Sequence, residues 1–245
     1  PIAADIVDIE AVLTNFDGIT YAKGASVLKL LSHWVGEDTF FAATRAYFAQ
    51  HAYANTTLPD FLSALETASG RDMSAWSSEW LQTSGVNTLR PSFEVDDDGK
   101  FTSFTIEQTA IPEHPTLRLH RLRIGQYADD ANGLRRIGQV EVDVSGASTE
   151  VPELVGVAQP ALLLLNDDDL TYAKIRLDET SWHTLVSSIG EFRESLPRTL
   201  CWGAAWDMTR DAEVSAGEYL DLVLNGIDQE TEVSAVQSLL RLASQ

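Results

Sequence analysis

The sequence predicts an α+β protein of several domains, with a helical first part, an antiparallel β-sandwich and a second helical part. Three observations carry this prediction. Apolar residues recur at helical spacing in residues 1–86, change to period two in residues 87–176, and return to helical spacing in residues 177–245. The chain has 245 residues, 44% of them apolar, which is enough for one large domain or two to three small ones.

The first part contains a series of predicted helices, each opened by a capping or acidic residue. They begin at about Gly18, Glu37, Thr57 and Asp72. Glycine is expected to end the first, third and fourth of them, at Gly36, Gly70 and Gly85. Phe61, Leu62 and Leu65 of the third helix are expected to face inward. The apolar positions of the other three are Ile19, Val27, Leu28, Leu30, Leu31 and Trp34, then Phe40, Phe41, Tyr47 and Phe48, then Met73, Trp76, Trp80 and Leu81.

The middle part alternates between apolar and polar residues and predicts strands. Phe101–Thr109 is rich in Phe, Thr and Ile, and Leu134–Val144 places Leu134 and three valines on one face with polar residues on the other. Asp, Asn and Gly clusters separate the strands, at residues 96–99, 129–133 and 166–169. Strands of this length with such turns favour a small antiparallel sandwich.

The last part returns to helices. Ser181–Phe192 is one candidate, and Ser195 is expected to cap the next, with Pro197 in its first turn. Ser215–Glu218 is a capping-box pattern, and Thr231 is expected to start the final helix. Short helices joined by short loops predict the start of a helical-hairpin stack.

Charge and composition exclude several classes of partner. The formal net charge is −20, which disfavours nucleic acids and acidic membrane surfaces, because both require clustered Lys and Arg. No apolar run approaches the ~20 residues that span a bilayer. The chain starts at Pro1 without a targeting signal, so we expect it to begin inside a longer protein or after processing. The single cysteine, Cys201, is expected to be a buried structural thiol, and it fits a reducing compartment.

No familiar metal or nucleophile motif is present. The five histidines are scattered, and H-E-x-x-H is absent; they are His33, His51, His114, His120 and His183. The aspartates at 96–98 and 167–169 lack calcium-loop spacing and are expected to be turn residues. Asn55-Thr56-Thr57 matches a glycosylation sequon, but we interpret Thr57 as a helix cap.

Tyr21 is the candidate catalytic residue, because of its context. It lies near the start of a predicted helix, and Gly24 lies inside that helix, where glycine costs about 1 kcal/mol relative to alanine. A glycine there is explained if another group approaches the backbone closely. Lys23 is expected to be solvated rather than catalytic.

The segment around Tyr21 resembles the zinc metallo-aminopeptidases of the aminopeptidase N type (gluzincins), and the bacterial ones most. The shared pattern is Phe16-Asp17-x-Ile19-x-Tyr21-x-Lys23-Gly24-Ala25-x-Val27-Leu28. Phe48–His51, Thr57–Phe61 and Trp80–Gly85 match further along. The order of the three parts also matches: the helical second half of a thermolysin-like catalytic domain (1–86), a β-sandwich (87–176) and the start of a helical C-terminal domain (177–245).

The resemblance implies an activity that this chain does not carry alone. In the family, zinc is held by the histidines of H-E-x-x-H and a following glutamate, all upstream of the tyrosine. Only Tyr21 carries over, as donor to the oxyanion of the tetrahedral intermediate. The full-length enzyme would use zinc to remove N-terminal residues from peptide substrates, in the cytoplasm. The fragment is expected to bind no zinc, to be inactive, and to self-associate or shift its first twenty residues, because faces that pack on the missing N-terminal half of the same protein are exposed.

Two alternatives stay open at this point. One is a non-catalytic interaction or scaffold protein made of a sandwich and a helical stack. The other is a full-length but catalytically dead relative of the family. A zinc-binding motif upstream of Pro1 in the parent reading frame favours the enzyme, whereas a native start near Pro1 favours the scaffold.

Overall fold

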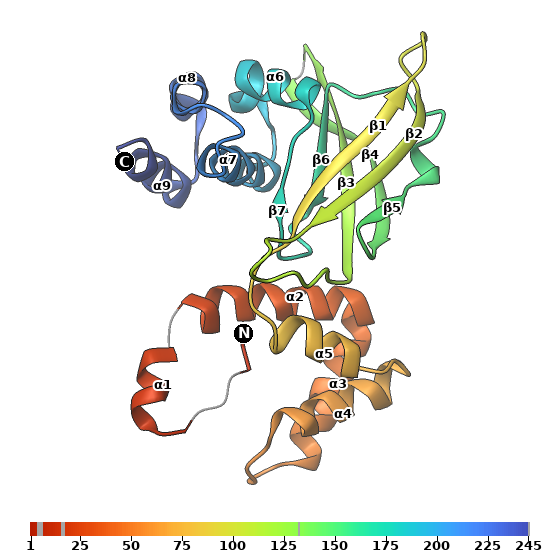
Figure 1. Ribbon diagram of the computed structural model, residues 1–245, viewed down its shortest axis with the longest axis vertical. Coiled ribbons are helices and arrows are strands. Elements are labelled where there is room, and N and C mark those ends of the chain that lie inside the picture. The colour runs from red at the N-terminus through yellow and green to blue at the C-terminus, as the bar shows by residue number, and fades with distance from the viewer. Residues whose placement is uncertain (4–6, 16–17, 132, 245) are drawn as a thin grey trace. The chain divides into compact units, whose positions relative to one another are not determined.

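The computed structural model describes residues 1–3, 7–15, 18–131 and 133–244, without the side chains of Thr14 and Asn15. Phe16 and Asp17 of the sequence pattern, and Asn132 of a predicted turn, lie outside the described residues. The chain divides into two compact units (Figure 1). The first unit comprises Pro1–Asn87, Ala110–Arg121 and Leu170–Tyr172, and the second comprises Thr88–Thr109, Leu122–Asp169 and Ala173–Gln245. The division into three domains stays a prediction.

The first unit is helical, as expected. Its elements are α1 (Ile9–Asn15), a π-helical turn (Ile19–Lys23), α2 (Gly24–Val35), α3 (Glu37–Gln50), α4 (Leu58–Ser69) and α5 (Ser74–Leu81). Gly36 and Gly70 end α2 and α4 with φ of 91° and 66°, a conformation that favours glycine. Thr57 caps α4 in a capping box with Asp60, which confirms its structural role. Helix α1 was not predicted.

Two of the four apolar positions of α3 lie at its surface. Phe41 is 49% and Phe48 is 67% exposed. Phe40 and Tyr47 do pack inward, edge-on against Phe61 of α4. Neighbouring helix positions differ by about 100°, so the residue that follows each inward position turns toward the surface. The face of α3 that contacts α4 is therefore narrower than the apolar pattern suggested.

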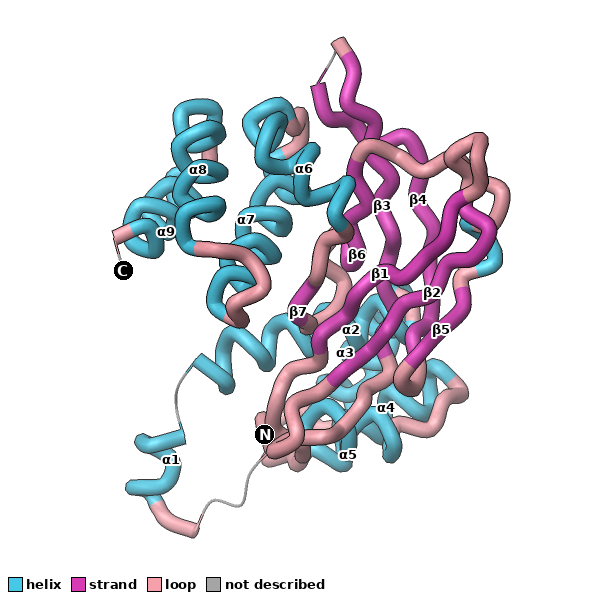
Figure 2. The backbone as a smooth tube through the Cα atoms, turned by 45° about the horizontal axis from the view of Figure 1, so that its top comes forward, coloured by secondary structure: helices cyan, strands magenta, loops and turns pink. Residues whose placement is uncertain are grey.

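The second unit contains the sandwich. Its strands are β1 (Thr88–Val95), β2 (Phe101–Thr109), β3 (His120–Asp130, whose first two residues belong to the first unit), β4 (Gly133–Val144), β5 (Ser148–Glu150), β6 (Leu162–Asp167) and β7 (Lys174–Ile175). One sheet has the order β5-β2-β1-β7 and the other β4-β3-β6 (Figure 2). Strands β1 and β2, β2 and β5, and β3 and β6 pair antiparallel, and β1 and β7 form a short parallel pair. Both predicted strands are confirmed, one of them to the residue.

Helices α6 (Glu179–Ser188), α7 (Ser195–Arg210), α8 (Ala216–Gly226) and α9 (Val233–Ala243) follow the sandwich. Leu163 of β6, Leu185 of α6 and Cys201 of α7 belong to one hydrophobic core, so sandwich and helices fold together. The capping box at Ser215 and Glu218 is confirmed. Ser195 is the first helical residue instead of the cap, which is Glu194. The last helix starts at Val233, two residues beyond Thr231.

A buried ion pair joins α7 to the segment before α9. Arg198 donates from Nε and Nη2 to the two carboxylate oxygens of Glu230, both at 2.9 Å, and Trp202 Nε1 donates to the same carboxylate at 2.9 Å. Burial raises the pKa of Glu230, but hydrogen bonds from Arg198, the Glu232 N–H and Trp202 outweigh it, and the net pKa lies below its ordinary 4.5. The charged carboxylate is therefore the form that the fold stabilises.

We expect Glu230→Gln to lower the free energy of unfolding of the second unit by about 2 kcal/mol at neutral pH, because charge-assisted hydrogen bonds become neutral ones. A lowered folded-state pKa gives stability that is complete above pH 4.5 and is lost as the pH falls through the folded-state value. The difference between the two proteins should therefore shrink on acidification. Urea unfolding measured at neutral pH and below pH 4 tests this. A difference independent of pH would contradict the assignment.

Candidate active site

Tyr21 lies on the π-helical turn Ile19–Lys23, which leads directly into α2. The N–H of Gly24 donates to the carbonyl oxygen of Ile19, five residues back. The turn therefore holds one residue more than an α-helical turn, and such turns are frequent at functional sites. Hydrophobic spacing predicted a continuous helix here and missed the turn. The side chain of Tyr21 is 63% exposed.

Lys23, in the same turn, points the other way. We expected it to be solvated, and that expectation is wrong, since it is only 6% exposed. Its Nζ donates to the carbonyl oxygen of Thr83 at 3.3 Å and lies 6.0 Å from the centroid of the Tyr172 ring. Burial, and after it the charge of Arg118, lowers the pKa of Lys23. Two residues along a helix are about 200° apart, so burying Lys23 turns Tyr21 outward.

An apolar pocket of about 460 Å³ opens beside Tyr21. Residues from the chain start, the π-helical turn and helices α2, α4 and α5 line it, among them Ile2, Tyr21, Leu28, Leu58, Phe61 and Trp76. Leu28 and Ile19, on the apolar side of the predicted helix, are 47% and 45% exposed, as expected for a face that packs on the missing N-terminal half. A hydroxyl donor beside an apolar hollow of this size is an arrangement typical of ligand sites.

Gly24 also lines this pocket. A Cβ atom at Gly24 would meet its nearest heavy atom, the carbonyl oxygen of Ile19, at 3.9 Å, which is an ordinary contact. Within the described residues nothing crowds this glycine. The close approach that we inferred from its place in a helix is not made by the described part of the chain.

Arg118 organises the loop that holds Lys23, and the sequence did not single it out. It is 1% exposed and lies with its guanidinium 5.4 Å from the Trp80 ring centroid. Nε donates to Glu79 O at 2.9 Å, Nη1 to Asn87 Oδ1 at 3.0 Å, and Nη2 to Thr83 Oγ1 and Ser84 O at 2.7 Å. Arg118 is one of three arginines within six residues of sequence, and nothing in the local pattern distinguished it from Arg121 and Arg123.

The histidines and the cysteine do not form a metal site in the described part of the chain, where no group of three or more His, Cys, Asp or Glu side chains could hold an ion. His120 is buried with Nδ1 2.8 Å from Thr171 Oγ1, and burial, with the charge of Arg118, lowers its pKa to about 3. It is a neutral structural histidine. Cys201 is fully buried as expected, and burial raises the pKa of its thiol.

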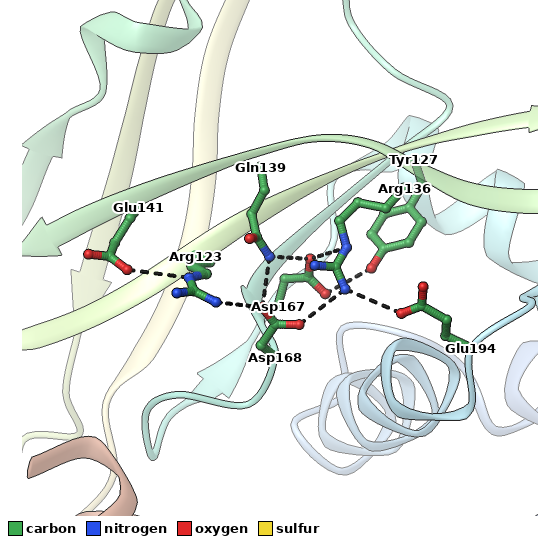
Figure 3. A network of polar contacts seen from close by, with 8 residues as sticks. All are labelled: Arg123, Tyr127, Arg136, Gln139, Glu141, Asp167, Asp168 and Glu194. Carbon is green, nitrogen blue, oxygen red and sulfur yellow. Dashed lines mark hydrogen bonds and ion pairs between the residues drawn. The ribbon is translucent and has the colours of Figure 1, made fainter. Parts of the chain in front are cut away.

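The aspartates at the end of β6 belong to a polar network in the second unit (Figure 3). Asp167 is fully buried, accepts from Tyr127 Oη at 2.8 Å and lies 3.1 Å from Arg136 Nε. Asp168 accepts from Arg123 Nη1 at 2.9 Å and from Arg136 Nη2 at 3.1 Å, and Gln139 Nε2 donates to both aspartates. Arginine and amide groups are the partners of these two carboxylates. Asp167 and Asp168 therefore stabilise the second unit in addition to forming the turn that the sequence suggested.

Helices long and apolar enough to cross a bilayer do not occur among the residues that the structure describes.

Two protein-family models match parts of this chain. A model of the "Peptidase family M1 domain" matches residues 1–80, and a model of the "ERAP1-like C-terminal domain" matches residues 162–245. The first match contains Tyr21 and Lys23.

Individual relatives agree with the family models. "Aminopeptidase N" of Streptomyces lividans is 57% identical over 98% of this chain, which covers 29% of that relative. "Tricorn protease-interacting factor F2" of Thermoplasma volcanium is 24% identical over the whole chain, which covers 28% of that relative. A crystal structure of Legionella pneumophila aminopeptidase A in complex with aspartic acid shares the fold over 94% of this chain and 30% of its own, with a TM-score of 0.60 and 14% identity. The chain thus spans less than a third of the curated relatives' length.

Proposed function

This chain belongs to the M1 peptidase family, in its aminopeptidase N type, and on that premise we propose that the full-length protein removes N-terminal residues from peptides. The chain then supplies the helical second half of the catalytic domain, the sandwich and the start of the C-terminal helical domain. One observation carries the proposal: Tyr21 of the family pattern is exposed on a π-helical turn beside an apolar pocket.

Tyr21 would act as a hydrogen-bond donor. A tetrahedral intermediate of amide hydrolysis carries a negative oxygen, and a phenol O–H can donate to it. Donors that are already in place where the charge develops lower the barrier, since they need no reorganisation during the reaction.

Zinc, which the family resemblance implies, does not fit the residues of this chain. The described residues bring no three suitable ligands together. We therefore assign no reaction step on this chain to a metal. Its ligands would come from the part of the full-length protein that the chain does not span, and the chain alone is expected to be inactive.

A cytoplasmic location belongs to the same proposal. Its support is the one buried, reduced cysteine, Cys201, which fits a reducing compartment. Cell fractionation with detection of the full-length protein tests it, and recovery outside the cytoplasmic fraction would contradict it.

The proposed activity predicts a specific pattern of hydrolysis by the full-length protein. It should cleave aminoacyl para-nitroanilides, fail to cleave the same compounds after N-acetylation, and lose activity when a chelator removes its metal. Added zinc should restore the activity. The isolated 245-residue chain is the matched control and should cleave none of these compounds. Full-length protein without hydrolysis, even after zinc is supplied, would favour the scaffold or the catalytically dead relative.

A further inference from the structure

The same π-helical turn that exposes Tyr21 buries a lysine. Lys23 is 6% exposed, whereas Tyr21, two residues earlier, is 63% exposed. Burying an ammonium group is costly, and packing alone would be served by an apolar side chain of similar length. The polar end of Lys23 is directed at the carbonyl oxygen of Thr83, 60 residues further along the chain. This contact needs an explanation beyond filling space.

The carbonyl that receives Lys23 is itself held in place. Nη2 of Arg118 donates to the hydroxyl of Thr83 and to the carbonyl oxygen of Ser84, both at 2.7 Å. The other guanidinium nitrogens reach Glu79 O and Asn87 Oδ1. Arg118 is buried, so these bonds are sheltered from water. The residues at 83–84 are thus a firm anchor point for the ammonium group.

The π-helical turn requires such an anchor because the same residues could also form an α-helical turn. A π-helical turn contains one residue more than an α-helical turn. If the turn relaxed to α-helix, the residues before it would rotate by about 100° about the helix axis, and Tyr21, inside the turn, would rotate by part of that angle. Tyr21 would then face a different direction. If the bond from Lys23 to the Thr83 carbonyl forms only when the turn is π-helical, it fixes the direction in which the Tyr21 side chain points.

We propose that Lys23 is a positioning residue, whose bond to the Thr83 carbonyl and contact with the Tyr172 ring hold the turn so that the Tyr21 hydroxyl meets the reacting group. This inference rests on the proposed function. Lys23 touches no substrate in this account and acts only through Tyr21. Replacing Lys23 should therefore lower kcat only when the Tyr21 hydroxyl is present.

A double-mutant cycle in the full-length enzyme tests this. Lys23→Met keeps the apolar stem and removes the donor, and it should lower kcat about tenfold with little change in KM, as expected for a misplaced catalytic group. In a Tyr21→Phe background the same substitution should have no further effect. Affinity for a phosphinic dipeptide, tetrahedral at phosphorus, should fall by the same factor. Lys100→Met, at an exposed lysine of the β1–β2 hairpin, is the matched control and should change nothing.

A second variant guards against misfolding of the first. Tyr172→Leu removes the aromatic face near Lys23 and should lower kcat about threefold, the effect of losing one cation–π contact, again only when Tyr21 is present. Equal losses in both backgrounds would show a merely structural role and overturn the inference. So would normal turnover of Lys23→Met beside a slow Tyr21→Phe enzyme. Normal turnover of Tyr21→Phe itself would instead refute the role of Tyr21, and the inference with it.

Discussion

Replacing Tyr21 with phenylalanine in the full-length protein should lower kcat by about a hundredfold or more and leave KM almost unchanged. The substitution removes one oxygen atom from a side chain that is mostly exposed, so the fold loses little. A hydrogen bond made only to the developing oxyanion is worth on the order of 3 kcal/mol, and its loss appears in kcat. Zinc content should be unchanged, because Tyr21 is not among the expected ligands.

Steady-state kinetics, metal analysis and thermal unfolding of the two proteins test this. Tyr53→Phe is the matched control, since Tyr53 is a fully exposed tyrosine of the same unit, outside the pocket. It should have normal kinetics. Unaltered turnover of Tyr21→Phe would remove Tyr21 from the mechanism. A loss of zinc together with activity would show that the tyrosine supports the metal site and not the intermediate.

Replacing Arg118 with methionine should lower the free energy of unfolding of the first unit by about 3–5 kcal/mol. Methionine fills much of the same space but donates no hydrogen bond. The variant leaves four acceptors without their donor, the buried Asn87 Oδ1 and the partly buried Glu79 O, Thr83 Oγ1 and Ser84 O. Asn87 Oδ1 loses its partner without regaining water, and four bonds are lost together, which makes the loss larger than that of an exposed ion pair.

Hydrogen exchange in α5 and in residues 110–121, combined with urea unfolding, measures this effect where it is expected. Arg135→Met is the control. Arg135 is 46% exposed and pairs with Asp130 at 2.9 Å on the surface of the second unit, so its loss should cost at most about 0.5 kcal/mol. Equal effects of the two substitutions would contradict the view of Arg118 as the organising residue of the first unit.

Much of the fold could be predicted because its signals are local. The caps at Thr57 and Ser215 and the glycine stop at Gly36 act within one turn of helix, and the structure contains all three. The strand Phe101–Thr109 follows from period-two alternation and from the Asp96–Gly99 turn that precedes it. The α+β class and the family assignment are confirmed as well, the second by a relative 57% identical over nearly the whole chain.

The errors fall where burial depends on distant partners. Phe41 and Phe48 are apolar positions of a predicted helix, but they remain 49% and 67% exposed. We expected Lys23 to be solvated, but Thr83 and Tyr172 lie against its ammonium group. We expected Asp167 to be a turn residue, but its carboxylate also contacts Tyr127 of β3 and Arg136 and Gln139 of β4. The type of a side chain alone does not determine which residues from distant parts of the sequence pack against it.

The sequence by itself determined the succession of helical, β and helical parts, several helix caps and stops, and the Tyr-x-Lys-Gly pattern that places the chain in its family. Those features depend on residues within a few positions of one another. Only the tertiary structure decided that the phenol of Tyr21 faces outward and the ammonium of Lys23 inward, because that choice depends on a carbonyl 60 residues away. It likewise made Arg118 the centre of the loop that holds them, since its hydrogen-bond acceptors lie 31 to 39 residues earlier in the chain.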